Sequence, residues 1–107
     1  MKLRKQLFTD HWETLTEQAG FDSQKAQLVL AFGDTAKIVL PEQLAYLRES
    51  YPNAAIAFAS TSGEIASNNV YDHSIVALAI WLEKSNVVTV ETDVREHKSS
   101  FEAGIFL

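Results

Sequence analysis

Two short apolar runs, separated by a helical pattern, constrain the fold of this chain most strongly. The first run, Leu28 to Phe32, ends at Gly33-Asp34, and the second spans Ala54 to Ala59. Continuous apolar runs of this length, bounded by turn residues, are typical of strands buried on both faces of a sheet. Between them, Pro41 to Ser50 begins with proline and carries its leucines on one side, which predicts a helix. Strand, helix and strand in this order predict a βαβ unit with two parallel strands.

Further strand patterns follow this unit. The apolar run Ile75 to Leu82 predicts a central strand, and Asn68-Asn69 marks a turn before it. Val88 to Val94 alternates apolar and polar residues, which predicts a half-exposed strand antiparallel to its predecessor. We therefore expect an α/β (mixed α+β) fold, in which antiparallel strands extend the βαβ unit into one mixed sheet with helices packed on it. At 107 residues, the chain 1–107 is expected to be a single domain.

The N-terminal segment carries the signals of a helix. Asp10 is a good N-cap and Glu13 follows three residues later, while Gly20 suits a left-handed residue just past a helix end. We therefore expect a helix from Asp10 to Gly20. The basic residues before it, Lys2, Arg4 and Lys5, are expected to form a solvated tail.

The C-terminal segment ends on apolar residues. Ser99-Ser100 predicts the N-terminus of a helix, and the sequence finishes at Ile105-Phe106-Leu107. Chain ends of this kind are seldom left undocked. Together with the excess of strand, this ending predicts a homodimer or a higher homo-oligomer.

Composition excludes several classes of function. The chain has 14 acidic and 9 basic residues, so its net charge of −5 disfavours nucleic-acid partners. It has no cysteine, which removes disulfides, thiolate metal sites, iron–sulfur clusters and cysteine nucleophiles. The longest apolar run, Ile75 to Leu82, is far shorter than the roughly 20 residues that a bilayer requires, and no secretory signal is present. We expect a cytoplasmic protein without a membrane partner.

Polar residues follow both strands of the βαβ unit. Asp34 comes after the first strand, and the second is followed by the five residues Ser60, Thr61, Ser62, Gly63 and Glu64. Parallel strands end at the same edge of a sheet, where α/β proteins bind ligands. Hydroxyls and glycine N–H groups suit a carboxylate, and Asp34 and Glu64 suit an ammonium group. This edge therefore predicts a site for a zwitterion such as an amino acid, with an ordinary turn and a solvated Glu64 as the alternative.

Catalysis and metal binding have weaker support. Ser60 or Ser62 as nucleophile, with His73 as base and Asp34 or Asp72 as its orienting group, would form a triad. The Gly-x-Ser-x-Gly elbow is missing, however, so we expect no catalytic residues.

The three histidines are His11, His73 and His97, and their spacing matches no metal motif. We therefore expect no metal site and no cofactor. A single histidine as an axial haem ligand stays open as an alternative.

Four segments together resemble a known family. They are Leu28 to Asp34, Leu44 to Pro52, Phe58 to Ile65 and Val70 to Val76. Their order and spacing resemble the N-terminal part of a FIST domain (F-box and intracellular signal transduction). The most specific piece is the family signature Ser-Thr-x-Gly-Glu-Ile at Ser60 to Ile65. The resemblance covers Leu28 to Gly104, so the chain looks like the front part of a longer N-terminal FIST domain.

The resemblance implies a sensory and non-catalytic role. FIST domains are regarded as small-ligand sensors of bacterial signal transduction, proposed to bind amino acids or related metabolites. Some members resemble haem-based nitric oxide sensors that control a histidine kinase, which would be the signalling partner. Phe58-Ala59 stand where the family often has cysteine, which excludes a cysteine-dependent role. A structural or oligomerisation module without a competent pocket is the alternative from another class.

Overall fold

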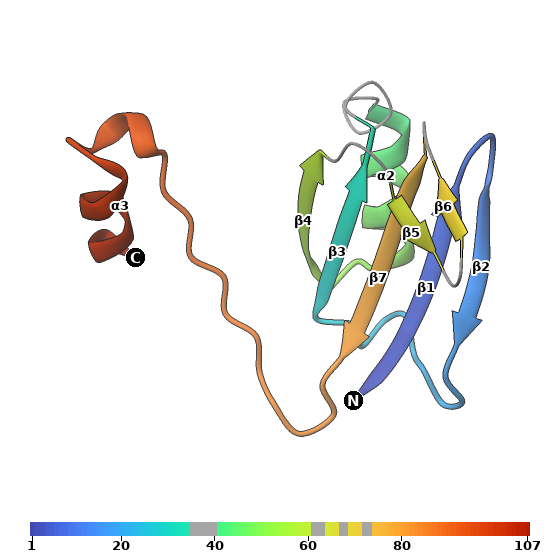
Figure 1. The fold of residues 1–107 in the computed structure, drawn as a ribbon. Coiled ribbons are helices and arrows are strands. Elements are labelled where there is room, and N and C mark those ends of the chain that lie inside the picture. Colours follow the sequence, from blue (N-terminus) through green and yellow to red (C-terminus); the bar gives the residue numbers. More distant parts are fainter. Residues whose placement is uncertain (35–40, 61–63, 67–68, 72–73) are drawn as a thin grey trace.

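A computed structural model describes residues 1–34, 41–60, 64–66, 69–71 and 74–107 of the chain (Figure 1). Its strands are β1 (Lys2–Phe8), β2 (Trp12–Glu17), β3 (Leu28–Gly33), β4 (Ala55–Ser60), β5 (Glu64–Ala66), β6 (Asn69–Tyr71) and β7 (Ile75–Trp81). Its helices are α2 (Pro41–Ser50), the single 3₁₀ turn η1 (Val94–Glu96) and α3 (Ser100–Phe106).

The main sheet has five strands in the order β2-β1-β7-β3-β4. β3 and β4 run parallel with α2 between them along the chain, so the predicted βαβ unit is confirmed. β7 lies in the centre and pairs antiparallel with both β1 and β3, as the apolar run Ile75 to Leu82 predicts. The short hairpin of β5 and β6 forms a second sheet. The prediction of one mixed sheet with helices on it is therefore confirmed.

The predicted helix from Asp10 to Gly20 is wrong, because this segment belongs to a β-hairpin. β1 pairs antiparallel with β2, and Phe8 lies opposite Trp12. Leu3 and Leu7 lie on one face of β1, which pairs with β7. The later residues pair with β1 in turn, so sheet pairing overrides their helical spacing. Gly20 does have a positive φ of 84°, but it lies in a turn after β2 rather than at a helix end.

The basic N-terminal residues are also not a solvated tail. Lys2, Arg4 and Lys5 all lie in β1 and are half-buried. Strand β1 fills the place beside β7, and Arg4 lies opposite Ala79. A third of the chain's positive side chains is thus fixed on the sheet.

Helix α2 covers one face of the sheet and builds the core there. Its Leu47 is fully buried, as is Tyr51, which directly follows the helix. They pack against a row of buried residues from β3 and β7: Val29, Ala31, Ile75, Ala77 and Ala79. The buried side of α2 therefore includes the predicted Leu47 and Tyr51, and also Gln43.

The strands are not buried on both faces, which corrects the interpretation of the two apolar runs. In β3, Val29 and Ala31 are buried under α2, whereas Leu28 and Leu30 on the other face are only half-buried. Phe32 on that face is 42% exposed. The continuous apolar runs thus reflect a sheet with two apolar faces, of which α2 covers one.

The C-terminal residues form an arm that leads away from the sheet (Figure 1). Residues 87–93 have no regular structure, so the strand predicted for Val88 to Val94 is wrong. It was expected beside β7, but β1 and β3 occupy both sides of that strand. The predicted start of α3 is confirmed, because Ser99 is its N-cap and its Oγ accepts a hydrogen bond from the Glu102 N–H at 3.2 Å.

No helix in the described part of the chain has the length and apolar character needed to cross a bilayer.

Candidate functional site

The candidate site lies at the edge of the sheet where β3 and β4 end. Gly33, the last residue of β3, is the register partner of Ser60, the last residue of β4. Asp34 follows directly, so the two predicted residues Asp34 and Ser60 flank the same edge of the sheet. Asp34 is half-buried and Ser60 is exposed. A carboxylate and an exposed hydroxyl at the same edge of a sheet can hold a small polar ligand by charge and hydrogen bonds.

Close packing fixes the backbone at Asp34. A Cβ atom added at Gly33 would lie 2.5 Å from the carbonyl oxygen of Ser74 and 2.9 Å from a side-chain carbon of Ile75. The next N–H, that of Asp34, donates a hydrogen bond to the same Ser74 carbonyl at 3.0 Å. Glycine is needed because β7 approaches so closely, and this contact holds Asp34 at the strand end.

The other predicted site residues are described only in part. Thr61, Ser62 and Gly63 lie outside the described residues. Glu64 is the first residue of β5, and its register partner in β6 is Tyr71. The backbone of Glu64 thus starts the hairpin of β5 and β6.

Two further residues at this edge were not predicted as part of the site. Phe32 exposes a large apolar ring on the face opposite α2, and its register partners are Val76 and Ala59. Ser74 is fully buried and supplies the carbonyl that holds Asp34. Phe32 was visible as the last apolar residue before Gly33, whereas nothing in the sequence marked Ser74.

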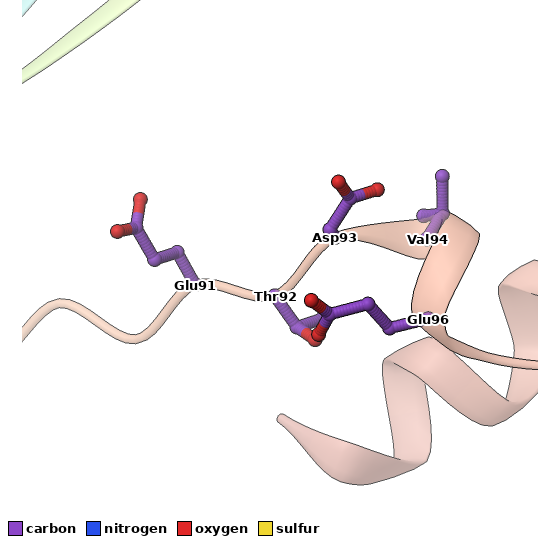
Figure 2. Close-up of a pocket in the computed structure, with 5 residues that line it drawn as sticks. All are labelled: Glu91, Thr92, Asp93, Val94 and Glu96. Atoms are coloured by element: carbon purple, nitrogen blue, oxygen red, sulfur yellow. The ribbon is translucent and has the colours of Figure 1, made fainter.

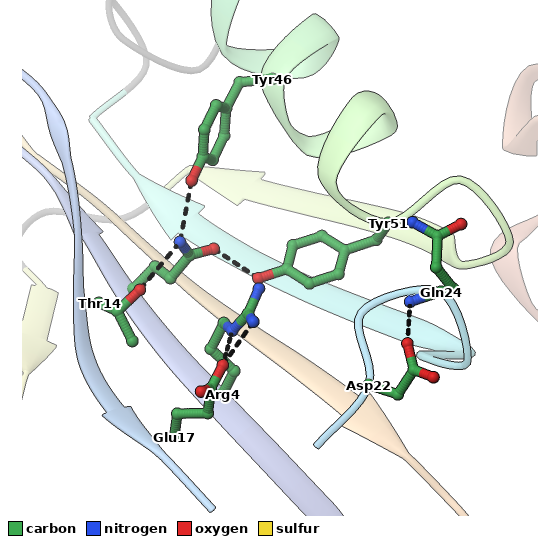
Figure 3. A network of polar contacts seen from close by, with 8 residues as sticks. Arg4, Thr14, Glu17, Asp22, Gln24, Tyr46 and Tyr51 are labelled. Atoms are coloured by element: carbon green, nitrogen blue, oxygen red, sulfur yellow. Dashed lines mark hydrogen bonds and ion pairs between the residues drawn. The ribbon is translucent and has the colours of Figure 1, made fainter. Parts of the chain in front are cut away.

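A second polar cluster lies on the α2 face of the sheet (Figure 3). The Gln6 amide donates to the Tyr46 hydroxyl at 2.9 Å and accepts from the Tyr51 hydroxyl at 2.5 Å. Arg4 forms an ion pair with Glu17, and its guanidinium lies 5.8 Å from the centre of the Tyr51 ring. Burial raises the pKa of Tyr51, and the opposing effect of Arg4 is smaller.

This cluster is structural rather than a binding site. Its donors and acceptors pair with one another, and no buried side-chain nitrogen or oxygen of the described residues lacks a partner. A satisfied network of this kind ties β1, β2 and α2 together and specifies their packing.

A hollow in the C-terminal arm does not suit an anionic ligand. It has a volume of about 620 Å³ and is lined by Glu91, Thr92, Asp93, Val94 and Glu96 (Figure 2). Arg95 pairs with Asp93 and lowers the pKa of this carboxyl, so the hollow keeps its negative charge. Arg95 compensates the charge of Asp93 alone, so Glu91 and Glu96 repel the carboxylate of an amino acid.

The described residues do not assemble the conceivable catalytic triad or a metal site. Ser62, Asp72 and His73 of the conceivable triad lie outside the described residues. His11 is exposed near Glu13, and the Nε2 atom of His97 lies 2.8 Å from the Thr92 hydroxyl. Within residues 1–34, 41–60 and the later described segments, no group of three or more histidines and carboxylates could hold a metal ion.

Comparison with known protein families decides what kind of domain carries this edge. A family model described as the FIST N domain matches residues 27–107, about three quarters of the chain. The chain belongs to the FIST N domain family. FIST domains are associated with sensing in signal transduction and are generally non-catalytic. The match includes β3, β4 and the candidate edge, and it leaves out the hairpin of β1 and β2. Searches of curated proteins and of solved structures found no match.

Proposed function

We propose that this FIST domain is a small-ligand sensor of bacterial signal transduction that binds an amino acid or a related metabolite. Its site is the carboxyl edge of β3 and β4, with Asp34, Ser60, Thr61, Ser62, Gly63 and Glu64 as the binding residues. The observation that carries this proposal is the pairing of Gly33 with Ser60, which brings the two polar strand ends to one edge. The sensor is cytoplasmic, and its output goes to a signalling protein such as a histidine kinase.

The chemistry of this edge favours a zwitterion over a phosphate. Asp34, whose backbone N–H is held by the Ser74 carbonyl, offers a carboxylate to an ammonium group, and a second carboxylate at Glu64 adds to the negative charge. The hydroxyls and N–H groups of Ser60 to Gly63 are suited to a single carboxylate. A multiply charged phosphate would meet repulsion from both acids. The exposed ring of Phe32 offers an apolar contact for a side chain of the ligand.

One structural observation favours a second candidate, an oligomerisation module without a competent pocket. Apolar side chains are exposed along the arm, including Phe101, Ile105 and Leu107. Exposed apolar patches mark interaction surfaces as well as ligand grooves. The two functions differ in one respect, because only the sensor is stabilised by a small molecule.

Thermal unfolding with single amino acids tests the proposal. We expect one chemical class of amino acid to raise the midpoint of the full chain by several degrees at millimolar concentration, because a ligand that binds only the folded state stabilises it. The Asp34→Asn variant removes the charge and keeps the side-chain shape, so it should weaken binding at least tenfold in calorimetric titration.

Asp22→Asn is the matched control. Asp22 precedes β3, so it lies near the start of this strand rather than at its carboxyl end. Its carboxylate accepts a hydrogen bond from the Gln24 N–H at 2.9 Å, and asparagine can accept the same bond. This variant should bind like the parent chain. Equal affinities of the Asp34→Asn variant and the parent would refute the site, and the absence of any stabilising ligand would favour the oligomerisation module.

A further inference from the structure

Strand β4 is the outermost strand of the main sheet, and the side that faces away from β3 is open in the described structure. It pairs only with β3 among the described residues, in the register from Leu28 and Ala55 to Gly33 and Ser60. The Ala55 N–H donates to the Gln27 carbonyl at 3.0 Å, on the β3 side. Since successive residues of a strand direct their backbone groups to opposite sides, those of Ile56 and Phe58 face outward.

This open edge lacks the features that normally prevent strand addition. The sequence of β4 is Ala-Ile-Ala-Phe-Ala-Ser, without lysine, proline or any charge. Natural edge strands are commonly protected by charged side chains, proline or bulges. An unprotected edge of six residues therefore accepts another extended segment.

A matching segment is present in the arm of the same chain. Val88, Val90 and Val94 are 84%, 62% and 59% exposed, and they alternate with polar residues over 88–94. β-branched residues in alternation are suited to a half-buried strand. The segment is kept from its expected place beside β7 because both sides of that strand are taken. It thus has the composition of a strand and no strand partner in the described structure.

The connection from β7 is long enough to bring this segment to β4. Ile80 of β7 and Ala55 of β4 are both register partners of Leu28, so β7 ends at the level where β4 begins. From β7 to a strand outside β4 there are three strand spacings, roughly 14 Å. Residues 82–87 span at most about 20 Å when extended. The arm can therefore reach the edge without disturbing the sheet.

The arm already runs along this side of the molecule. In Figure 1 it passes on the β4 side of the sheet and runs in the direction of that strand. Thr89, Val90 and Glu91 line a cavity of about 600 Å³ together with Ala55, Ile56, Ala57 and Phe58. The segment and the open edge thus lie on opposite sides of one cavity.

We propose that residues 88–94 add to the free edge of β4 as a further strand, parallel to it. The short tether keeps this segment at high local concentration, so it outcompetes the same segment of a second copy. The added strand ends at the level of Ser60, near the carboxyl ends of β3 and β4, where the candidate ligand site lies. This inference is independent of the proposed function, because it follows from the edge and the arm alone.

Disulfide trapping tests the proposal, since the chain has no cysteine of its own. The two double variants are Ala57→Cys with Val90→Cys and Ala57→Cys with Glu91→Cys, because neighbouring residues of the added strand face opposite sides. We expect one of the two to form an intrachain disulfide in most molecules after mild oxidation, seen by intact mass and on non-reducing gels. Glu13→Cys with Val90→Cys is the control at the other edge of the sheet, and it should cross-link in less than a tenth of the molecules.

Two outcomes would overturn the proposal. Absence of a cross-link in both β4 pairs would show that the segment does not reach the edge. Covalent dimers as the main product would assign the edge to a second copy of the chain.

Hydrogen exchange gives a second readout without cysteines. The outward N–H groups of Ile56 and Phe58 should exchange at least tenfold faster in a Val90→Pro variant, because proline disrupts the added strand. Unchanged exchange at Ala79 in β7 would show that the sheet is intact in this variant. Equal protection of Ile56 and Phe58 in the variant and the parent would contradict the added strand.

Discussion

Glycine at position 33 fixes the candidate site at the scale of a single residue. Any side chain there would meet the backbone of Ser74 and Ile75, and the neighbouring Asp34 depends on the same contact. The residue is therefore required by the close approach of β3 and β7 rather than by its conformational freedom.

Gly33→Ala should destabilise the fold by about 1–3 kcal/mol, because the added methyl group overpacks a site formed by backbone atoms. Chemical denaturation of the variant and the parent measures this difference. Gly104→Ala is the control, since a Cβ there meets nothing within 4 Å. It should leave the sheet unaffected and favour α3 by roughly 0.5–1 kcal/mol. Equal stability of Gly33→Ala and the parent would contradict the described packing.

Tyr51 gives a second residue-level prediction, one that depends on pH. Tyr51→Phe removes the hydroxyl that donates to Gln6, leaves a buried acceptor unpaired and should cost about 1–3 kcal/mol at neutral pH. Burial raises the pKa of Tyr51 above its usual 10.0. The stability of the parent is thus fully present below pH 10 and falls as the pH rises through the raised pKa.

Denaturation of both proteins across the alkaline range tests this effect. The stability difference between the parent and Tyr51→Phe should shrink as the pH rises, because only the parent pays for an ionised buried phenol. Tyr46→Phe serves as the comparison, because the Tyr46 hydroxyl accepts a hydrogen bond from Gln6 at 2.9 Å. A pH-independent difference would show that the Tyr51 hydroxyl is not buried in the way described.

At the scale of elements, the sequence predicts best where local and long-range preferences agree. Proline at position 41 and the leucine spacing agree with the covering role of α2, and the predicted helix is confirmed from Pro41 to Ser50. The hydrophobic runs of β3, β4 and β7 are likewise confirmed. Because β3 and β4 run parallel, the sequence could predict that Asp34 and Ser60 lie at the same edge of the sheet.

Prediction fails where strand pairing decides the conformation. The cap signals at Asp10 and Glu13 are local, and they lose to the pairing of β2 with β1. The pairing of β7 with both β1 and β3 leaves no place beside β7 for Val88 to Val94. Ser74 could not be predicted as a support of the site either, because its role depends on a carbonyl that only the register of β7 and β3 places.

Trp12 adds an aromatic contact between α2 and the hairpin of β1 and β2. The Trp12 ring stacks on Tyr46 with centroids 4.8 Å apart, and its N–H donates to the Gln43 amide oxygen at 3.0 Å. Trp12→Ala should cost about 3 kcal/mol through lost ring packing and an unpaired Gln43. Trp12→Phe keeps most of the stacking and should cost less. Equal denaturation midpoints for the Ala variant and the parent would show that the hairpin does not depend on this contact.

At the scale of the whole molecule, one apolar face of the sheet is left without a helix over it in the described structure. Leu28, Leu30 and Phe32 on this face are half-buried or exposed, and the arm carries exposed Phe101 and Ile105. The homodimer or higher homo-oligomer that the sequence predicts stays a prediction. Light scattering coupled to size exclusion should give at least twice the monomer mass of 11.9 kDa, and a monodisperse monomer at high concentration would contradict it.

The proposed site for a small zwitterion is the edge of the sheet where β3 and β4 end. The most direct measurement is a ¹⁵N–¹H chemical-shift titration of the full chain with the amino acid that stabilises it most. Binding at this edge should give saturable shifts for the N–H groups of Gly33, Asp34 and Ser60, with little change at the acidic hollow of the arm around Asp93. Shifts confined to the arm, or none at the edge of the sheet at saturating ligand, would contradict it.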